Sequence, residues 1–120
     1  MQHHSLIALA STARKLLQVL LLAMGAIAVA AADEPISDAR GMQLLGKYNC
    51  LACHAVDSTL TGPSLRAVAK RYSSDPEAID DLEGSVLNGS SGAWGGSAMP
   101  SNDVPDADLR ALINWILQLM

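Results

Sequence analysis

The stretch that decides the fold is Cys50-Leu51-Ala52-Cys53-His54, a C-x-x-C-H motif near the middle of a 120-residue chain. On a helical turn, a two-residue spacer places both thiols on one side and delivers the next side chain, an imidazole, beside them. Two thiols and one imidazole have three chemical interpretations: attachment of a haem, a redox-active disulfide, or part of a zinc site. The rest of the chain decides between them.

The first 32 residues have the layout of a secretory signal. The basic pair Arg14-Lys15 precedes an apolar run over 16–30 that ends in small residues. This run falls short of the ~20 residues that a comfortable membrane span needs, which favours a cleaved signal over a retained anchor. Ala28-Val29-Ala30 and Ala30-Ala31-Ala32 both fit a cleavage site, and the polar start at Asp33 favours the second. We therefore predict export, removal of residues 1–32, and one domain over 33–120.

Charge and size describe a small acidic domain. The 88 residues from 33 to 120 carry six Lys or Arg and twelve Asp or Glu, a net charge of −6, which argues against nucleic acid as a partner. A chain of this length is near the lower limit for a self-sufficient core. It has two Trp, two Tyr and no Phe, so we expect a cofactor to fill the centre.

Hydrophobic periodicity predicts an all-α domain of about four helices with one long functional loop. Ser37 is expected to cap a first helix over about 37–48, and a second covers about 64–72. Asp75-Pro76 should open a third that Asn88-Gly89 ends in a left-handed conformation, and Pro105 opens the last. The expected inward faces are Gly41, Leu44, Leu45 and Tyr48; Leu65, Val68 and Tyr72; Ile79, Leu82 and Val86; and Leu109, Leu112, Ile113 and Ile116, with Trp115 flanking the last stripe.

In an exported helical chain the C-x-x-C-H motif favours covalent haem attachment. Cys50 and Cys53 would form thioethers with the haem vinyl groups, and His54 would be the proximal iron ligand. A thioredoxin-like disulfide expects a βαβ setting, which the helical pattern lacks. Zinc needs about four N or S ligands, whereas residues 33–120 offer as Cys and His only Cys50, Cys53 and His54.

Three methionines follow the signal and compete for the sixth position on the iron. Met42 lies in the first helix, where we expect it to fill the core, and Met120 is the last residue. Met99 lies in a Gly/Ser-rich loop whose glycines can approach a porphyrin edge closely. Pro100 then restricts Met99 to an extended conformation. We therefore predict one haem c with His54 and Met99 as axial ligands.

An ordered set of motifs spans almost the whole of 33–120. It consists of Cys50–His54, Gly62-Pro63-Ser64, Asn88-Gly89, Trp94-Gly95, Met99-Pro100, Asn102 and Trp115. With these gaps the set resembles the class I cytochromes c, and more narrowly the small bacterial periplasmic cytochrome c-551 type. The resemblance implies a class I cytochrome c fold whose terminal helices cross near Gly41, beside Trp115.

The resemblance also implies supporting contacts around the haem. The Pro63 carbonyl should accept a hydrogen bond from His54 Nδ1–H, as partners of metal-binding histidines usually do. Trp94 should donate its indole N–H to a haem propionate, and Asn102 should hydrogen-bond near the Met99 sulfur.

These features predict a periplasmic, monomeric electron carrier rather than an enzyme, because His54/Met99 ligation leaves no open position on the iron. The resemblance suggests a haem-containing nitrite reductase, a terminal oxidase or a cytochrome c peroxidase as acceptors. Two alternatives stay open: a haem-c subunit of a larger oxidoreductase complex, and a ligand-binding or peroxidatic haem protein if Met99 does not coordinate. Lys70-Arg71 could help docking, or could simply be a solvated helix end.

Overall fold

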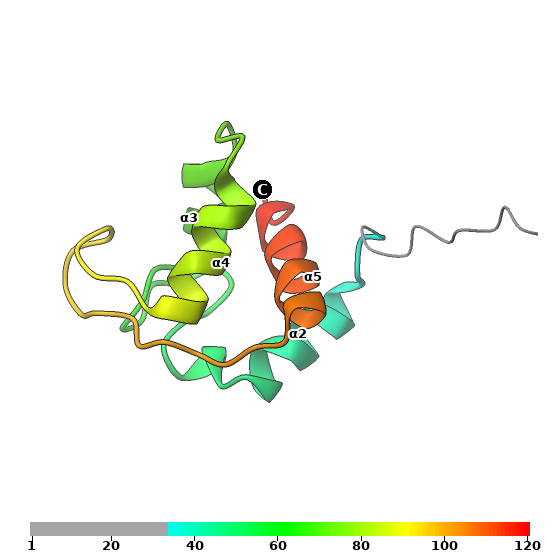
Figure 1. Ribbon diagram of the computed structural model, residues 1–120, viewed down its shortest axis with the longest axis horizontal. Coiled ribbons are helices and arrows are strands. Elements are labelled where there is room, and N and C mark those ends of the chain that lie inside the picture. The colour runs from blue at the N-terminus through cyan, green and yellow to red at the C-terminus, as the bar shows by residue number, and fades with distance from the viewer. Residues whose placement is uncertain (1–33) are drawn as a thin grey trace, which may run out of the picture. The chain divides into compact units, whose positions relative to one another are not determined.

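Four helices and one short turn make up the domain. The computed structural model describes residues 34–120; the predicted signal over 1–32 lies outside this part. The helices are α2 (Asp38–Lys47), α3 (Leu65–Tyr72), α4 (Ala78–Asn88) and α5 (Asp106–Leu117), with a 3-10 turn, η1 (Cys50–Ala52). Helix α5 packs against each of the other three (Figure 1). Within residues 34–120, β structure is limited to two isolated bridges, so the predicted all-α class is confirmed.

The first and last helices cross where the resemblance implied. Ser37 caps α2, its Oγ accepting a hydrogen bond from Arg40 N at 3.3 Å. A Cβ on Gly41 would overlap the indole of Trp115, so the absence of a side chain lets the two helices approach. The Trp115 indole N–H donates to Asp38 Oδ1 at 2.9 Å. Trp115 is 5% exposed, so it belongs to the core itself rather than flanking the stripe.

The start and the end of α4 differ from the prediction. The helix begins at Ala78, not at Asp75-Pro76. Asp75 Oδ1 instead accepts a hydrogen bond from Glu77 N at 2.9 Å, which closes a turn ahead of the helix. At the other end Gly89 has the expected positive φ of 76°, but its ψ of 167° is extended rather than left-handed helical. The extended backbone is needed because the next residue, Ser90, enters a β-bridge.

The core lies along α5 in two clusters. The larger joins α2, α3 and α5, and the smaller lies beneath α4. The predicted inward residues of α2, α3 and α5 are buried, apart from Tyr48 and Tyr72 at the margin, and those of α4 are half-buried. Met42 was expected to fill the core, and this is wrong: it is 41% exposed. The buried face of α2 follows Gly41, Leu44 and Leu45, and the residue after Gly41 is turned about 100° away from it.

Candidate haem-binding site

The C-x-x-C-H motif folds as one tight turn directly after α2. Asn49 adopts a left-handed conformation with φ 57°, which reverses the chain into η1. The Cys50 carbonyl then accepts hydrogen bonds from Cys53 N at 3.1 Å and from His54 N at 3.0 Å. Both thiols are half-buried and are not joined by a disulfide. Burial raises the pKa of the Cys50 thiol.

The His54 ring is held by the two residues that precede Ser64. Its Nδ1 lies 2.8 Å from the Pro63 carbonyl oxygen. Because a carbonyl can only accept, Nδ1 donates this hydrogen bond, and Nε2 is the ring nitrogen left to bind a metal. A Cβ on Gly62 would lie 2.5 Å from His54 Cε1, so the ring packs directly on the glycine backbone.

The segment that carries His54 is anchored on the beginning of α3. Leu65 N donates to Ala55 O at 3.0 Å and Arg66 N to Val56 O at 3.1 Å. Ser64 is buried and caps the helix, its Oγ accepting from Ala67 N at 3.1 Å. This cap was not predicted, although a Ser directly before the apolar run of a helix is an N-terminus signal. The imidazole is thus fixed by a helix end rather than by a free loop.

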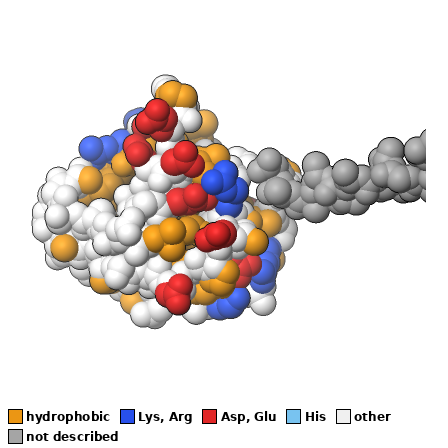
Figure 2. Space-filling view, viewed as in Figure 1, with side chains coloured by type: hydrophobic (Ala, Val, Ile, Leu, Met, Phe, Trp, Pro, Cys, Tyr) orange, Lys and Arg blue, Asp and Glu red, His pale blue; other side chains and the backbone are white. Residues whose placement is uncertain are grey.

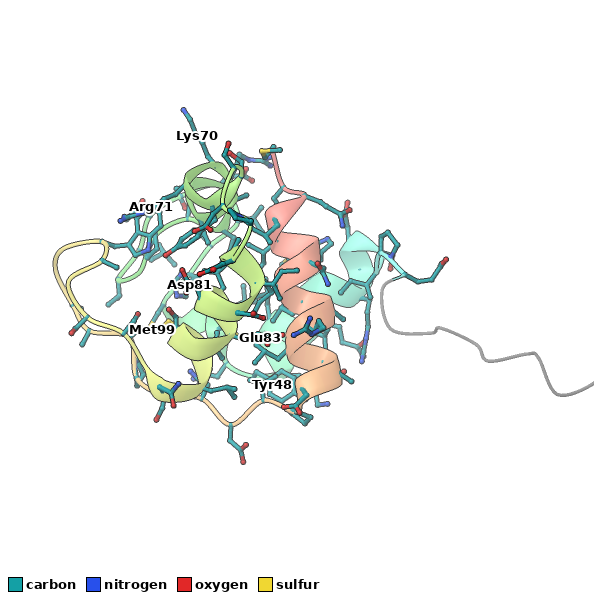
Figure 3. All side chains as sticks on the ribbon, turned by 45° about the horizontal axis from the view of Figure 1, so that its top comes forward. Tyr48, Lys70, Arg71, Asp81, Glu83 and Met99 are labelled. Atoms are coloured by element: carbon teal, nitrogen blue, oxygen red, sulfur yellow. The ribbon has the colours of Figure 1, made fainter. Side chains whose placement is uncertain are left out.

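Met99 lies at the base of the long loop between α4 and α5. Ser90 and Met99 form an antiparallel bridge, with Ser90 N donating to Met99 O at 3.0 Å and Met99 N to Ser90 O at 2.8 Å. A Cβ on Gly89 would be 2.8 Å from the Met99 carbonyl, so a glycine is required beside it. Figure 3 places Met99 beside α4. The backbone of Met99 is therefore well defined.

The other two predicted supporting residues occupy the same loop. Asn102 is half-buried, and its backbone N–H donates to Val86 O at 2.8 Å, which ties the chain after Met99 to α4. Trp94 is 39% exposed, with the guanidinium of Arg71 stacked 4.6 Å from the centre of its ring. This stacking was not predicted, because no local pattern links α3 to a loop that begins 17 residues after it.

These groups fit a covalently attached haem. Two half-buried thiols lie on one turn, and the Nε2 of the adjacent imidazole is not used by the Pro63 hydrogen bond. The zinc alternative lacks its donors, since no three His, Cys, Asp or Glu side chains in residues 34–120 are grouped to hold a metal ion.

The sequence profile of the cytochrome c family matches residues 39–120, which include the whole of this site. The chain belongs to the cytochrome c family. It is 46% identical over 77 residues to cytochrome c-552 of Nitrosomonas europaea, a match that covers 63% of this chain and 75% of that protein. It is 40% identical over 81 residues to cytochrome c-551 of Ectopseudomonas mendocina, covering 68% of this chain and 99% of the relative.

Solved structures agree with the family assignment. The crystal structure of wild-type cytochrome c552 from Nitrosomonas europaea superimposes with a TM-score of 0.64 at 44% identity, covering 66% of this chain and 99% of that one. The chain is therefore a small class I c-type cytochrome that carries electrons on a covalently attached haem c, and redox proteins are its partners. Carriers of this kind are not enzymes in the usual sense. No helix within residues 34–120 is long and apolar enough to cross a membrane.

Proposed function

We propose that this cytochrome is a periplasmic carrier of single electrons between respiratory redox proteins. In the proposal residues 1–32 are a signal that is removed, and 33–120 form one monohaem, monomeric domain. Cys50 and Cys53 hold the haem through thioethers, and His54 and Met99 are its axial ligands. The observation that carries the proposal is the hydrogen bond between His54 Nδ1 and the Pro63 carbonyl, since it leaves Nε2 available to a metal.

When bound, the haem supplies a one-electron Fe(III)/Fe(II) couple. The side chains around the iron set the reduction potential of that couple. A thioether from Met99 in place of a second imidazole favours the reduced state, so we expect a higher potential than with two histidines. The Pro63 carbonyl fixes the orientation of the imidazole and increases its basicity.

The same two ligands keep small molecules from the iron. Met99 is held by both hydrogen bonds of the Ser90 bridge, and its position is further limited by Gly89 and Pro100. A thioether held on such a backbone blocks the sixth position against oxygen and peroxide. This supports a carrier rather than an enzyme.

Trp94 and Asn102 are proposed as supporting haem contacts. The indole N–H of Trp115 is used by Asp38, whereas that of Trp94 enters no hydrogen bond formed within residues 34–120. It can therefore donate to a propionate, as the resemblance implies. Asn102 follows Met99 by three residues and is held against α4 through its backbone, which suits the proposed hydrogen bond near the sulfur.

The distribution of charge bears on docking. Asp and Glu side chains gather over α4 and α5 on the face that Figure 2 shows, and the part of this face nearest the long loop has little charge. We propose that partners approach the weakly charged loop side, because desolvating few charges suits a small, transient interface. A haem-containing nitrite reductase, a terminal oxidase or a cytochrome c peroxidase would be suitable acceptors.

An absorption spectrum of the purified, oxidised holoprotein tests the ligand set. A thioether bound to ferric haem gives a weak far-red band, which we expect in the native protein. It should disappear in Met99→Ala and persist in Met42→Ala, because Met42 is exposed on α2. A c-type spectrum without this band would contradict the proposal and favour a ligand-binding or peroxidatic protein. Purification only as part of a complex would instead favour an enzyme subunit.

A further inference from the structure

The segment between Ser90 and Met99 has little to hold it in place by itself. Residues 91–98 are all exposed. Gly92, Gly95 and Gly96 have positive φ values of 79°, 68° and 68°, and a Cβ at any of them would meet no atom within 4 Å. Glycines in such a segment lose much backbone freedom when the chain is ordered. The segment that leads to the proposed iron ligand therefore needs an anchor outside itself.

Arg71 supplies such an anchor from the last turn of α3. Its Nη1 donates a 2.6 Å hydrogen bond to the Ala93 carbonyl. The same guanidinium lies over the neighbouring Trp94 ring, 4.6 Å from its centroid. Of the hydrogen bonds formed within residues 34–120, this is the one that joins residues 91–98 to another part of the domain. In Figure 3, Arg71 extends from α3 toward the loop, whereas Lys70 points away from the domain.

The base of this anchor is rigid. Helix α3 is capped by buried Ser64, and Leu65, Val68 and Ala69 bury one face of it. A planar guanidinium can donate a hydrogen bond in its plane while its face stacks on an indole, a combination that an ammonium cannot reproduce. Arg71 thus links a fixed helix to two consecutive residues of the loop.

We propose that Arg71 is a positioning residue for Met99: it holds the 91–98 segment closed and so keeps the thioether in reach of the haem iron. The inference rests on the proposed function, because it takes Met99 as the sixth ligand. It also assigns a role within the molecule to a cation that the sequence alone offered as a docking determinant. Loss of Arg71 increases the fraction of molecules in which the loop is open and the sixth position is accessible.

Competition between Met99 and an added ligand measures the fraction of molecules in which the loop is open. Imidazole binds ferric haem only when Met99 is detached, so its apparent dissociation constant falls as the open population rises. We expect Arg71→Gln to bind imidazole on the order of tenfold more tightly than the native holoprotein, given one lost charged hydrogen bond and one lost cation–π contact. Arg71→Lys should lie between the two. Lys70→Gln, the same change of charge one residue earlier, should match the native protein within about twofold.

Three outcomes overturn the inference. Arg71→Gln could bind imidazole no more tightly than Lys70→Gln, or both could bind it more tightly by the same factor, which would indicate a general effect of charge. A lower urea midpoint for Arg71→Gln with unchanged imidazole affinity would likewise show that Arg71 stabilises the fold without positioning Met99. Failure of the proposed function is recognised separately, because the native protein itself would then lack the far-red band, and the inference would fall with it.

Discussion

At the scale of single residues, glycines decide how closely the elements approach. Gly41 lets α2 touch the Trp115 indole, and Gly62 lets the chain lie directly against the His54 ring. In contrast, Gly46, in the last turn of α2, has open space where a Cβ would stand. Within α2, close packing therefore requires a glycine at position 41 but not at position 46.

Gly41→Ala tests the contact between α2 and α5. The added methyl overlaps the indole of Trp115, so one helix must shift, and overpacking of this kind costs about 1–3 kcal/mol. We expect a corresponding loss of unfolding free energy in urea titrations of the holoprotein. Gly46→Ala is the matched control and should be neutral or stabilising by up to ~1 kcal/mol. Equal unfolding free energies of the two variants would show that α2 and α5 can move apart without loss of stability.

At the scale of elements, a carboxylate at the start of α5 ties it to α2. Asp108 Oδ1 accepts from Arg40 Nη2 at 3.1 Å, and its Oδ2 accepts from Lys47 Nζ at 2.9 Å and from the Tyr48 hydroxyl at 2.6 Å. The Tyr48 hydrogen bond, followed by the Lys47 ammonium, holds the pKa of Asp108 below its usual value. An acid in the first turn of a helix is also favoured by the helix dipole.

The pH dependence of stability tests this cluster. A carboxylate with a lower pKa in the folded chain than in the unfolded chain stabilises the fold above the unfolded value of about 3.9, and the effect disappears as the pH falls through the folded-state pKa. We therefore expect Asp108→Asn to lower the urea midpoint at pH 7, and the gap to the native protein to narrow below about pH 4.

Asp106→Asn is the control for that experiment. Asp106 lies in the same first turn of α5 and is exposed, so the change of charge and the interaction with the helix dipole are matched. It should change the midpoint less than Asp108→Asn at pH 7. The difference in urea midpoint between Asp108→Asn and the native protein could also persist unchanged in acid. That result would show that packing, and not charge, accounts for the difference.

At the scale of the whole molecule, α5 is the centre of the packing. Helices α2, α3 and α4 each pack on it, and the buried side chains form two small clusters along its length. The large buried aromatic is Trp115, while Tyr48 and Tyr72 remain half-buried. We expect a domain with so small a protein core to depend on its cofactor for stability.

Removal of the haem tests that dependence. In a Cys50→Ser/Cys53→Ser double variant no thioether can form, and we expect the protein to lose most of its helical signal in far-ultraviolet circular dichroism. The native holoprotein in the same buffer is the control. Native-level helicity in the double variant would show that the two protein clusters are sufficient for folding.

Local patterns in the sequence were enough for much of this molecule. The helix class and most inward residues of α2, α3 and α5 follow from periodicity, and the cap follows from the Ser at position 37. Both signals depend only on near neighbours in the chain. The C-x-x-C-H motif indicated its cofactor in the same way, because its three groups are adjacent. The local predictions that the structure changed concern two side chains, Met42 and Trp115, and the two ends of α4, at Asp75-Pro76 and at Gly89.

Only the tertiary structure decided how distant segments meet. The Asp108 cluster joins residues about 60 positions apart, and Arg71 reaches Ala93 across 22. The bridge between Ser90 and Met99 closes a loop whose glycines carry no pattern of their own. Contacts of this kind depend on where α5 places each element, and no short-range periodicity encodes them. The sequence by itself determined the haem-attachment motif and the helices, whereas only the tertiary structure brought Arg71 of α3 to the loop that leads to Met99.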